Sequence, residues 1–172
     1  MEGEAELREF VSARGAALSR AAYLLTGDHQ AAEDLVQETY VVMVRRWKRI
    51  DKVDPEAYVR RILYSRFVDG WRRRRLVELP WSTGADSSGG DEESAAADRL
   101  TLAHALQRLT PRQRAVLVLR FYEDLTEVQA AVVLDVSTST VKSQTRVALQ
   151  RLRDLAPDTV ASFAVPAEEV VE

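Results

Sequence analysis

The sequence TEVQAAVVLDVSTSTVKSQTRVALQRLR, residues 126–153, carries the strongest structural signal in the chain. It opens with a capping box, Thr126–Gln129, in which a Thr and a Gln three residues later bond the free N–H groups at a helix start. The helix that follows ends near Leu134. Asp135 then stands at a tight turn, where Asp tolerates positive φ better than most residues other than glycine.

A second, longer helix follows that turn. Ser137 or Thr138 caps it, and it runs to about Leu155 because Pro157 disfavours further helix. A short helix, a tight turn and a longer helix have the spacing of a helix-turn-helix. The final helix holds four basic residues and no acidic one between Ser137 and Arg153, namely Lys142, Arg146, Arg151 and Arg153.

The first turns of the final helix carry polar side chains that can reach phosphates and base edges when a helix enters the major groove. These residues are Thr138, Ser139, Thr140, Lys142 and Ser143. The alternative is a solvent-exposed basic face on a structural helix. Because the helix-turn-helix spacing precedes it, we favour an interaction with DNA.

Helical periodicity also runs through the rest of the chain. The first apolar stripe ends at Gly27, a typical C-terminal stop, and Asp28 suits the N-cap of a second helix that runs to about Trp47. Asp54–Pro55 opens a third helix, and Thr110–Gln113 is another capping box. No segment alternates with period two between turns, so the sequence predicts an all-α fold without a sheet.

Composition divides the chain into two small helical domains, 5–78 and 98–156. Residues 79–97 are rich in Ser, Gly and Asp and lack apolar periodicity, so we expect a flexible acidic linker. An acidic tail, 157–172, follows, and we expect it to be disordered. Domains this small are marginal alone, so we expect both to dock on a partner.

The net charge of −3, from 24 Lys and Arg against 27 Asp and Glu, is unevenly distributed. The segments around the two domains carry +2 and +4, whereas those around the linker and tail carry −5 and −4. The acidic total therefore does not exclude DNA as a partner.

Composition also excludes several classes of protein. The chain has no Cys, which rules out disulfides, thiolate nucleophiles and cysteine-ligated zinc within it. No run approaches the ~18 apolar residues of a membrane helix. Residues Met1–Glu6 are acidic where a secretory signal is basic. We therefore expect a cytoplasmic protein without membrane insertion.

Arginines gather along the third helix, as Arg60, Arg61, Arg66, Arg72, Arg73, Arg74 and Arg75. Four adjacent arginines point in every direction around a helix end, so they cannot all pair with one partner face, and clustered guanidinium groups suit phosphate oxygens. Phe67 and Trp71 fall on the apolar stripe and are predicted to lie in the core. Tyr64 lies off that stripe and is the better candidate to stack on a base.

One face of the second helix carries Asp34, Gln37 and Glu38. Composition alone indicates only a solvated acidic face there. We find no convincing catalytic site and predict no cofactor and no metal. His29 and Glu33 could share a metal but lack a third ligand, and His104 lies in an apolar run and is interpreted as structural.

These residues together resemble extracytoplasmic-function sigma factors, most closely the sigma-E-like group of high-GC bacteria. Three motifs resemble their region 2: YLLTGD at 23–28, AEDLVQE at 32–38 and PEAYVRR at 55–61. Two more resemble their region 4: LTPRQR at 109–114 and STSTVKS at 137–143. The likeness covers about residues 5–155, and the use of 21 Arg against three Lys also suits that group.

The resemblance implies a dissociable subunit that gives bacterial RNA polymerase its promoter choice. Core polymerase, through its β′ clamp and β flap, promoter DNA and an anti-sigma factor are the implied partners. The clamp would receive Asp34, Gln37 and Glu38. The −10 element would be bound as a single strand by Arg60, Arg61, Tyr64, Ser65, Arg72, Arg73, Arg74 and Arg75. The −35 duplex would be read by Thr138, Ser139, Thr140, Lys142, Ser143 and Arg146.

Ser65 departs from the family pattern, because many relatives have Asn at this position, which helps capture a flipped −10 base. The leading alternative is a stand-alone helix-turn-helix regulator that dimerises through its N-terminal helices. An enzyme that processes nucleic acid would require a metal site. A sigma factor can be distinguished from these alternatives by testing Asp34, Gln37 and Glu38, since only a sigma factor needs them to bind polymerase.

Overall fold

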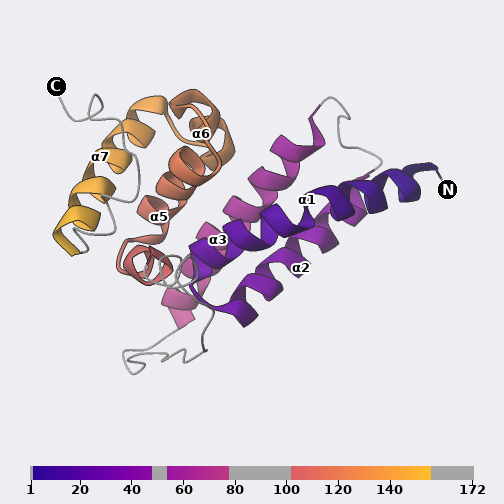
Figure 1. Cartoon of the computed structure of the whole chain (residues 1–172), viewed down its shortest axis with the longest axis horizontal. Coiled ribbons are helices and arrows are strands. Elements are labelled where there is room, and N and C mark those ends of the chain that lie inside the picture. Colours follow the sequence, from indigo (N-terminus) through magenta and orange to yellow (C-terminus); the bar gives the residue numbers. More distant parts are fainter. Residues whose placement is uncertain (1, 48–53, 78–101, 156–172) are drawn as a thin grey trace.

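We describe a computed structural model of the chain, which covers residues 2–47, 54–77 and 102–155 (Figure 1). The predicted linker 79–97 lies outside the described residues, as does the tail 157–172. The residues that the structure describes form helices and no strand, in agreement with the predicted all-α fold. None of these helices is long and apolar enough to cross a bilayer.

The first half of the chain contains α1 (Glu2–Thr26), α2 (His29–Arg46) and α3 (Pro55–Val77). The second half begins with helical residues 102–107. It continues with α5 (Pro111–Leu117), the π-helical turn η2 (Val118–Tyr122), α6 (Glu127–Leu134) and α7 (Thr138–Leu155).

The predicted helix boundaries are confirmed by the local hydrogen bonds. Gly27 has a φ of 72° after the last residue of α1, and the side chain of Asp28 caps α2 by accepting a bond from Ala31. Both capping boxes are formed, at Thr110–Gln113 and at Thr126–Gln129. These caps satisfy N–H groups that a helix start leaves free.

The turn between α6 and α7 also has the predicted geometry. Asp135 adopts the left-handed conformation with a φ of 54°, which permits the abrupt change of direction. The backbone N–H of Thr140 then donates to the hydroxyl of Ser137, so Ser137 rather than Thr138 caps α7. The helix-turn-helix is therefore present as predicted.

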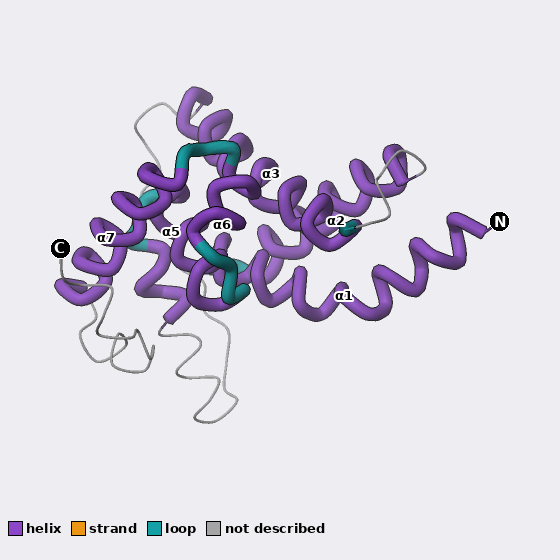
Figure 2. The backbone as a smooth tube through the Cα atoms, turned by 90° about the horizontal axis from the view of Figure 1, so that it is seen from above, coloured by secondary structure: helices purple, strands orange, loops and turns teal. Residues whose placement is uncertain are grey.

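The two halves pack on one another through a continuous apolar core. Leu25 of α1 and Phe67 of α3 belong to the same cluster of buried residues as Leu106, Val116 of α5 and Leu149 of α7. Figure 2 shows α5, α6 and α7 gathered beside one end of the three-helix bundle. In this arrangement each half serves as a docking partner for the other.

Arg114 is buried at the contact between the halves. Its guanidinium donates to the backbone carbonyls of Leu25, Leu106, Gln107 and Leu109, and it lies 5.6 Å from the centre of the Phe67 ring. Helix ends leave such carbonyls without donors, and the five N–H groups of arginine can satisfy several at once. Burial lowers the pKa of Arg114 to about 10, so the side chain stays charged at neutral pH.

One core prediction is wrong. Phe67 is 4% exposed and packs in the core, but Trp71 is 37% exposed although both fall on one apolar stripe. Among the α3 side chains that the structure describes, which end at Trp71, Val68 is the last one packed against the core cluster. The four-residue spacing identifies one side of the helix, but it does not show how far along that side the neighbouring helices extend.

Candidate functional site

The first turns of α7 present the polar face that the sequence predicts. Ser139, Lys142, Ser143 and Arg146 lie on one side of the helix and are exposed. The opposite side is buried and consists of Val141, Thr145, Ala148, Leu149 and Leu152. Thr138 is also exposed, whereas Thr140 is half-buried. The helix is therefore anchored by its apolar side and offers a basic polar side to a ligand.

The polar face of α2 is exposed as well. Asp34, Gln37 and Glu38 all face solvent, on the side of α2 away from its buried stripe. The carboxylate of Asp34 accepts a 3.2 Å hydrogen bond from Gln30, one turn earlier. A guanidinium N–H of Arg66 lies 3.9 Å from a carboxylate oxygen of Glu38. Both contacts are at the surface, so these carboxylates are accessible to a partner.

Two exposed valines that sequence reasoning missed extend this face. Val41 is 48% exposed and Val44 is 57% exposed. Helical spacing places them on the same side of α2 as Asp34 and Gln37, and they follow Gln37 by one and two turns. The sequence does contain a feature that indicates these exposed valines, namely the four consecutive apolar residues at 41–44. Such a run covers every direction around a helix, so it cannot be buried entirely.

The arginine-rich side of α3 is partly open and partly covered. Arg61 and Ser65 are exposed, and the hydroxyl of Ser65 donates to Asp69 at 3.3 Å. Arg66 is partly exposed. Arg72, Arg73, Arg74 and Arg75 lie in the helical backbone of α3, but their side chains fall outside what the structure describes.

Tyr64 does not lie where the sequence predicts. Its side chain is fully buried, so no base can stack on it in this arrangement. The hydroxyl donates a 2.6 Å hydrogen bond to Glu123, in the loop between η2 and α6. Burial, together with the negative charge of Glu123, raises the pKa of Tyr64 well above its ordinary value. The interpretation of Tyr64 as an open base-stacking residue is wrong for this arrangement, because the second half of the chain covers it.

Glu123 also forms an ion pair with Arg60, one helical turn before Tyr64. Only 15% of the Arg60 side chain and 13% of the Glu123 side chain are exposed. Burial lowers the pKa of Arg60, but Glu123 and Glu56 more than offset that effect and raise it overall. The Glu56 carboxylate lies 3.0 Å from Arg60 and 2.7 Å from Arg14 of α1. Nothing in the sequence points to Glu123, because its partners lie 59 and 63 residues away.

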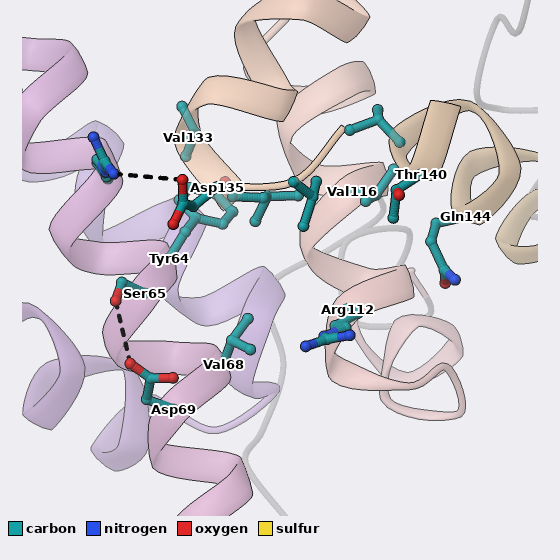
Figure 3. A pocket seen from close by; sticks show the side chains of 14 residues that line it. Tyr64, Ser65, Val68, Asp69, Arg112, Val116, Val133, Asp135, Thr140 and Gln144 are labelled. Atoms are coloured by element: carbon teal, nitrogen blue, oxygen red, sulfur yellow. Dashed lines mark hydrogen bonds and ion pairs between the residues drawn. The ribbon is translucent and has the colours of Figure 1, made fainter. Parts of the chain in front are cut away.

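A cleft of about 320 Å³ lies between α3 and the helix-turn-helix (Figure 3). Tyr64, Ser65 and Asp69 line it from α3, and Thr140 and Gln144 line it from α7. A guanidinium N–H of Arg61 lies 3.8 Å from the Asp135 carboxylate at the rim. Across this cleft, the Ser65 side of α3 faces α6 and the first turns of α7.

Within residues 2–47, 54–77 and 102–155, no three His, Cys, Asp or Glu side chains lie close enough together to hold an ion. The ring of His29 stacks on Tyr23, with the ring centres 4.5 Å apart. His104 is exposed rather than packed in the core.

Comparison with protein families gives two matches. Sigma-70 region 2 matches residues 10–77, and Sigma-70 region 4 matches residues 105–154. The first match covers the bundle of α1, α2 and α3. The second covers the helices from 105 through α7, including the helix-turn-helix.

Curated relatives match both halves together. The RNA polymerase sigma-E factor of Streptomyces avermitilis is 39% identical over 150 residues, which cover 87% of this chain and 84% of that protein. The ECF RNA polymerase sigma factor SigL of Mycobacterium tuberculosis is 33% identical over 156 residues, which cover 86% of each chain.

Among solved structures, the sigma factor RpoE from Bartonella quintana, crystallised with the anti-sigma factor NepR, has a similar fold. The TM-score is 0.69 at 22% identity, over 89% of this chain and 98% of that one. CnrH in complex with the cytosolic domain of CnrY gives a TM-score of 0.65 at 23% identity, over 90% and 89% of the two chains.

Proposed function

The chain belongs to the sigma-70 family of RNA polymerase sigma factors, and we propose on that basis how its residues divide the work of promoter-specific initiation. The first half binds the clamp of core polymerase and melts the −10 element. The second half reads the −35 element as duplex. The stand-alone regulator is not favoured, because the region 2 match accounts for the N-terminal helices as well.

The proposed polymerase contact is the exposed face of α2. It combines Asp34, Gln37 and Glu38 with Val41 and Val44, so charged groups and an apolar patch lie on one side of one helix. Partner helices bind such mixed faces well, because the apolar part supplies affinity and the charges set register. This face is the observation that carries the proposal, since it lies on α2 within the part of the chain that matches sigma-70 region 2.

The proposed −35 reader is the exposed side of α7. Lys142 and Arg146 supply positive charge one turn apart, and Thr138, Ser139 and Ser143 supply hydroxyl groups beside them. Thr140 completes the set from a half-buried position. Arginine and lysine suit the acceptor edge of guanine, and hydroxyl groups can reach bases or phosphates.

The proposed −10 surface runs along α3 and includes Arg60, Arg61, Tyr64, Ser65, Arg72, Arg73, Arg74 and Arg75. Arg60 and Tyr64 bond to Glu123 in the closed arrangement described above. For these two residues to touch DNA, the loop that carries Glu123 must move away. Ser65 is exposed and shorter than the Asn of many relatives, which favours a different preference for the base at its position.

An anti-sigma factor is the regulator that we propose for this chain. The RpoE structure was determined with the anti-sigma factor NepR, and the CnrH structure with the cytosolic domain of CnrY. We propose that the protein acts in the cytoplasm with polymerase and contributes binding rather than catalysis.

Transcription with purified core polymerase tests this function. Core polymerase with and without the protein is supplied with genomic fragments, beginning with the region upstream of its own gene. We expect run-off products from particular fragments only when the protein is present. Specific duplex binding as a dimer, with no effect on polymerase, would support the stand-alone regulator instead.

A further inference from the structure

We propose that Glu123 is an autoinhibitory latch, which holds the second half of the chain over Arg60 and Tyr64 and masks them from single-stranded DNA until the two halves separate. The proposal rests on the proposed −10 role of α3, and it adds a built-in resting state to that role.

Glu123 lies in a short loop between η2 and α6, and its side chain contacts α3. Glu123 follows η2 directly, and Asp124 after it has a φ of 53°, a left-handed conformation that turns the chain sharply toward α6. The neighbouring Tyr122 accepts a 2.9 Å hydrogen bond from Arg20 of α1. The last residue of η2 and the first residue of the loop therefore contact α1 and α3 respectively.

The Glu123 carboxylate contacts two donors on α3 at once. One oxygen accepts from the Tyr64 hydroxyl at 2.6 Å, and the other is paired with the Arg60 guanidinium. All three side chains are largely or fully buried. Bonds between charged groups shielded from water are stronger than surface ion pairs, so this contact contributes to holding the halves together.

A carboxylate and a DNA phosphate compete for the same groups. A guanidinium offers its planar N–H donors to either anion in the same bidentate way, and a tyrosine hydroxyl can donate to either. While Glu123 occupies Arg60 and Tyr64, a DNA strand cannot use them. The exposed side of α7 is not covered in this way, so the closed state masks the single-strand surface and leaves the duplex reader open.

Further contacts across the interface stabilise the closed state. Arg114 bonds to the carbonyl of Leu25 across the interface. At Gly27, any Cβ would overlap the Gln107 side chain, so the two halves meet closely there. The apparent affinity for DNA is then the affinity of the open state multiplied by the fraction of molecules that are open, and weakening the latch raises that fraction.

Two measurements on the full-length chain test the latch. The first is the affinity for a fluorescein-labelled oligothymidylate strand, without polymerase and at low salt. The second is the labelling rate of one thiol, placed by Val133→Cys in the contact between α6 and α3. Val133 is 6% exposed, and the natural chain has no other cysteine. Labelling is therefore slow in the closed arrangement, and its rate rises with the open fraction.

Glu123→Ala is expected to tighten oligothymidylate binding and to accelerate thiol labelling, each on the order of tenfold, because it removes two charge-assisted or buried hydrogen bonds. Glu123→Gln keeps the shape of the side chain and should give a smaller change in the same direction. Asp154→Asn is the matched control. It removes a carboxylate from an exposed site of the same half, where Gln150 on the same helix bonds to it.

Increases in both measurements over the Asp154→Asn control would support the latch. No change in either would overturn it. Tighter DNA binding without faster labelling would also overturn it, since the effect would then be one of local charge. Faster labelling without tighter binding would show that the contact masks no DNA surface. Thiol labelling needs no polymerase, so a failure of run-off transcription would reject the sigma function while leaving the test of opening intact.

Discussion

The hydroxyl of Tyr64 in α3 donates a 2.6 Å hydrogen bond to the carboxylate of Glu123, 59 residues later in the chain. This bond joins the helix assigned to single-stranded promoter DNA to the loop that precedes the helix-turn-helix. Because the bond crosses between the two halves, mutation of either residue or ionisation of the Tyr64 phenol weakens the contact that holds the halves together.

The phenol of Tyr64 predicts a loss of stability at alkaline pH. Its pKa is raised in the folded protein by burial and by Glu123, from an ordinary value of about 10. Below pH 10 the phenol is neutral in both the folded and the unfolded state, so it does not change the free energy of unfolding as the pH varies. Above pH 10, the unfolded chain loses the proton first, so the free energy of unfolding falls with a slope approaching ~1.4 kcal/mol per pH unit.

Urea unfolding of the wild type and of Tyr64→Phe between pH 8 and about 11 measures this slope. Arg114, whose pKa is lowered to about 10, works in the opposite direction because the folded protein loses its proton before the unfolded chain does. That contribution is common to both proteins and cancels in the difference. Equal slopes for wild type and Tyr64→Phe would contradict the prediction.

Arg114→Met is expected to destabilise the protein by about 2–4 kcal/mol, because several buried carbonyls lose their donor. The measurement is the urea midpoint at neutral pH. Arg112→Met is the control, since Arg112 lies two residues earlier on the same helix but is exposed. If both variants lose the same stability, Arg114 does not hold the helix ends together.

Asp34→Ala and Val41→Asp should each weaken binding to core polymerase, on the order of tenfold, if the exposed face of α2 is the docking surface. Fluorescence anisotropy of the labelled protein with core polymerase measures the affinity. Glu9→Ala, which removes an exposed carboxylate from α1, should leave it unchanged. Unaltered affinity in both α2 variants would place the polymerase contact elsewhere.

Arg146→Ala should weaken binding to the −35 duplex by ~1–3 kcal/mol if the side chain contacts a base. Promoter fragments identified by run-off transcription supply the probe, and Arg108→Ala is a control for the loss of one exposed arginine. An equal loss on every sequence would instead assign Arg146 to the phosphate backbone.

Much of the fold could be predicted because its signals are local. Capping boxes, Gly27 after α1 and Asp135 in the left-handed turn depend on residues within a few positions of one another, and each is formed as expected. The exposed sides of α2 and α7 follow from helical spacing in the same way. The helix-turn-helix and the three-helix bundle were therefore within reach of the sequence.

The burial of Tyr64 could not be predicted from the sequence, for a physical reason. Helical spacing shows that Tyr64 lies off the stripe of Val59, Leu63 and Phe67, but not that another part of the chain covers that side. Its polar hydroxyl also fits a solvent-exposed role, until Glu123 is known to accept its hydrogen bond. Contacts between the two halves depend on how they pack, which the spacing within each half does not encode.

This sigma factor is proposed to direct initiation through both halves, and run-off transcription with purified core polymerase tests that role most directly. We predict that the wild-type protein selects discrete start sites that core polymerase alone ignores, and that Asp34→Ala and Arg146→Ala each reduce those products. Initiation that is unchanged by adding the protein, together with dimeric binding to duplex DNA in the absence of polymerase, would contradict the claim.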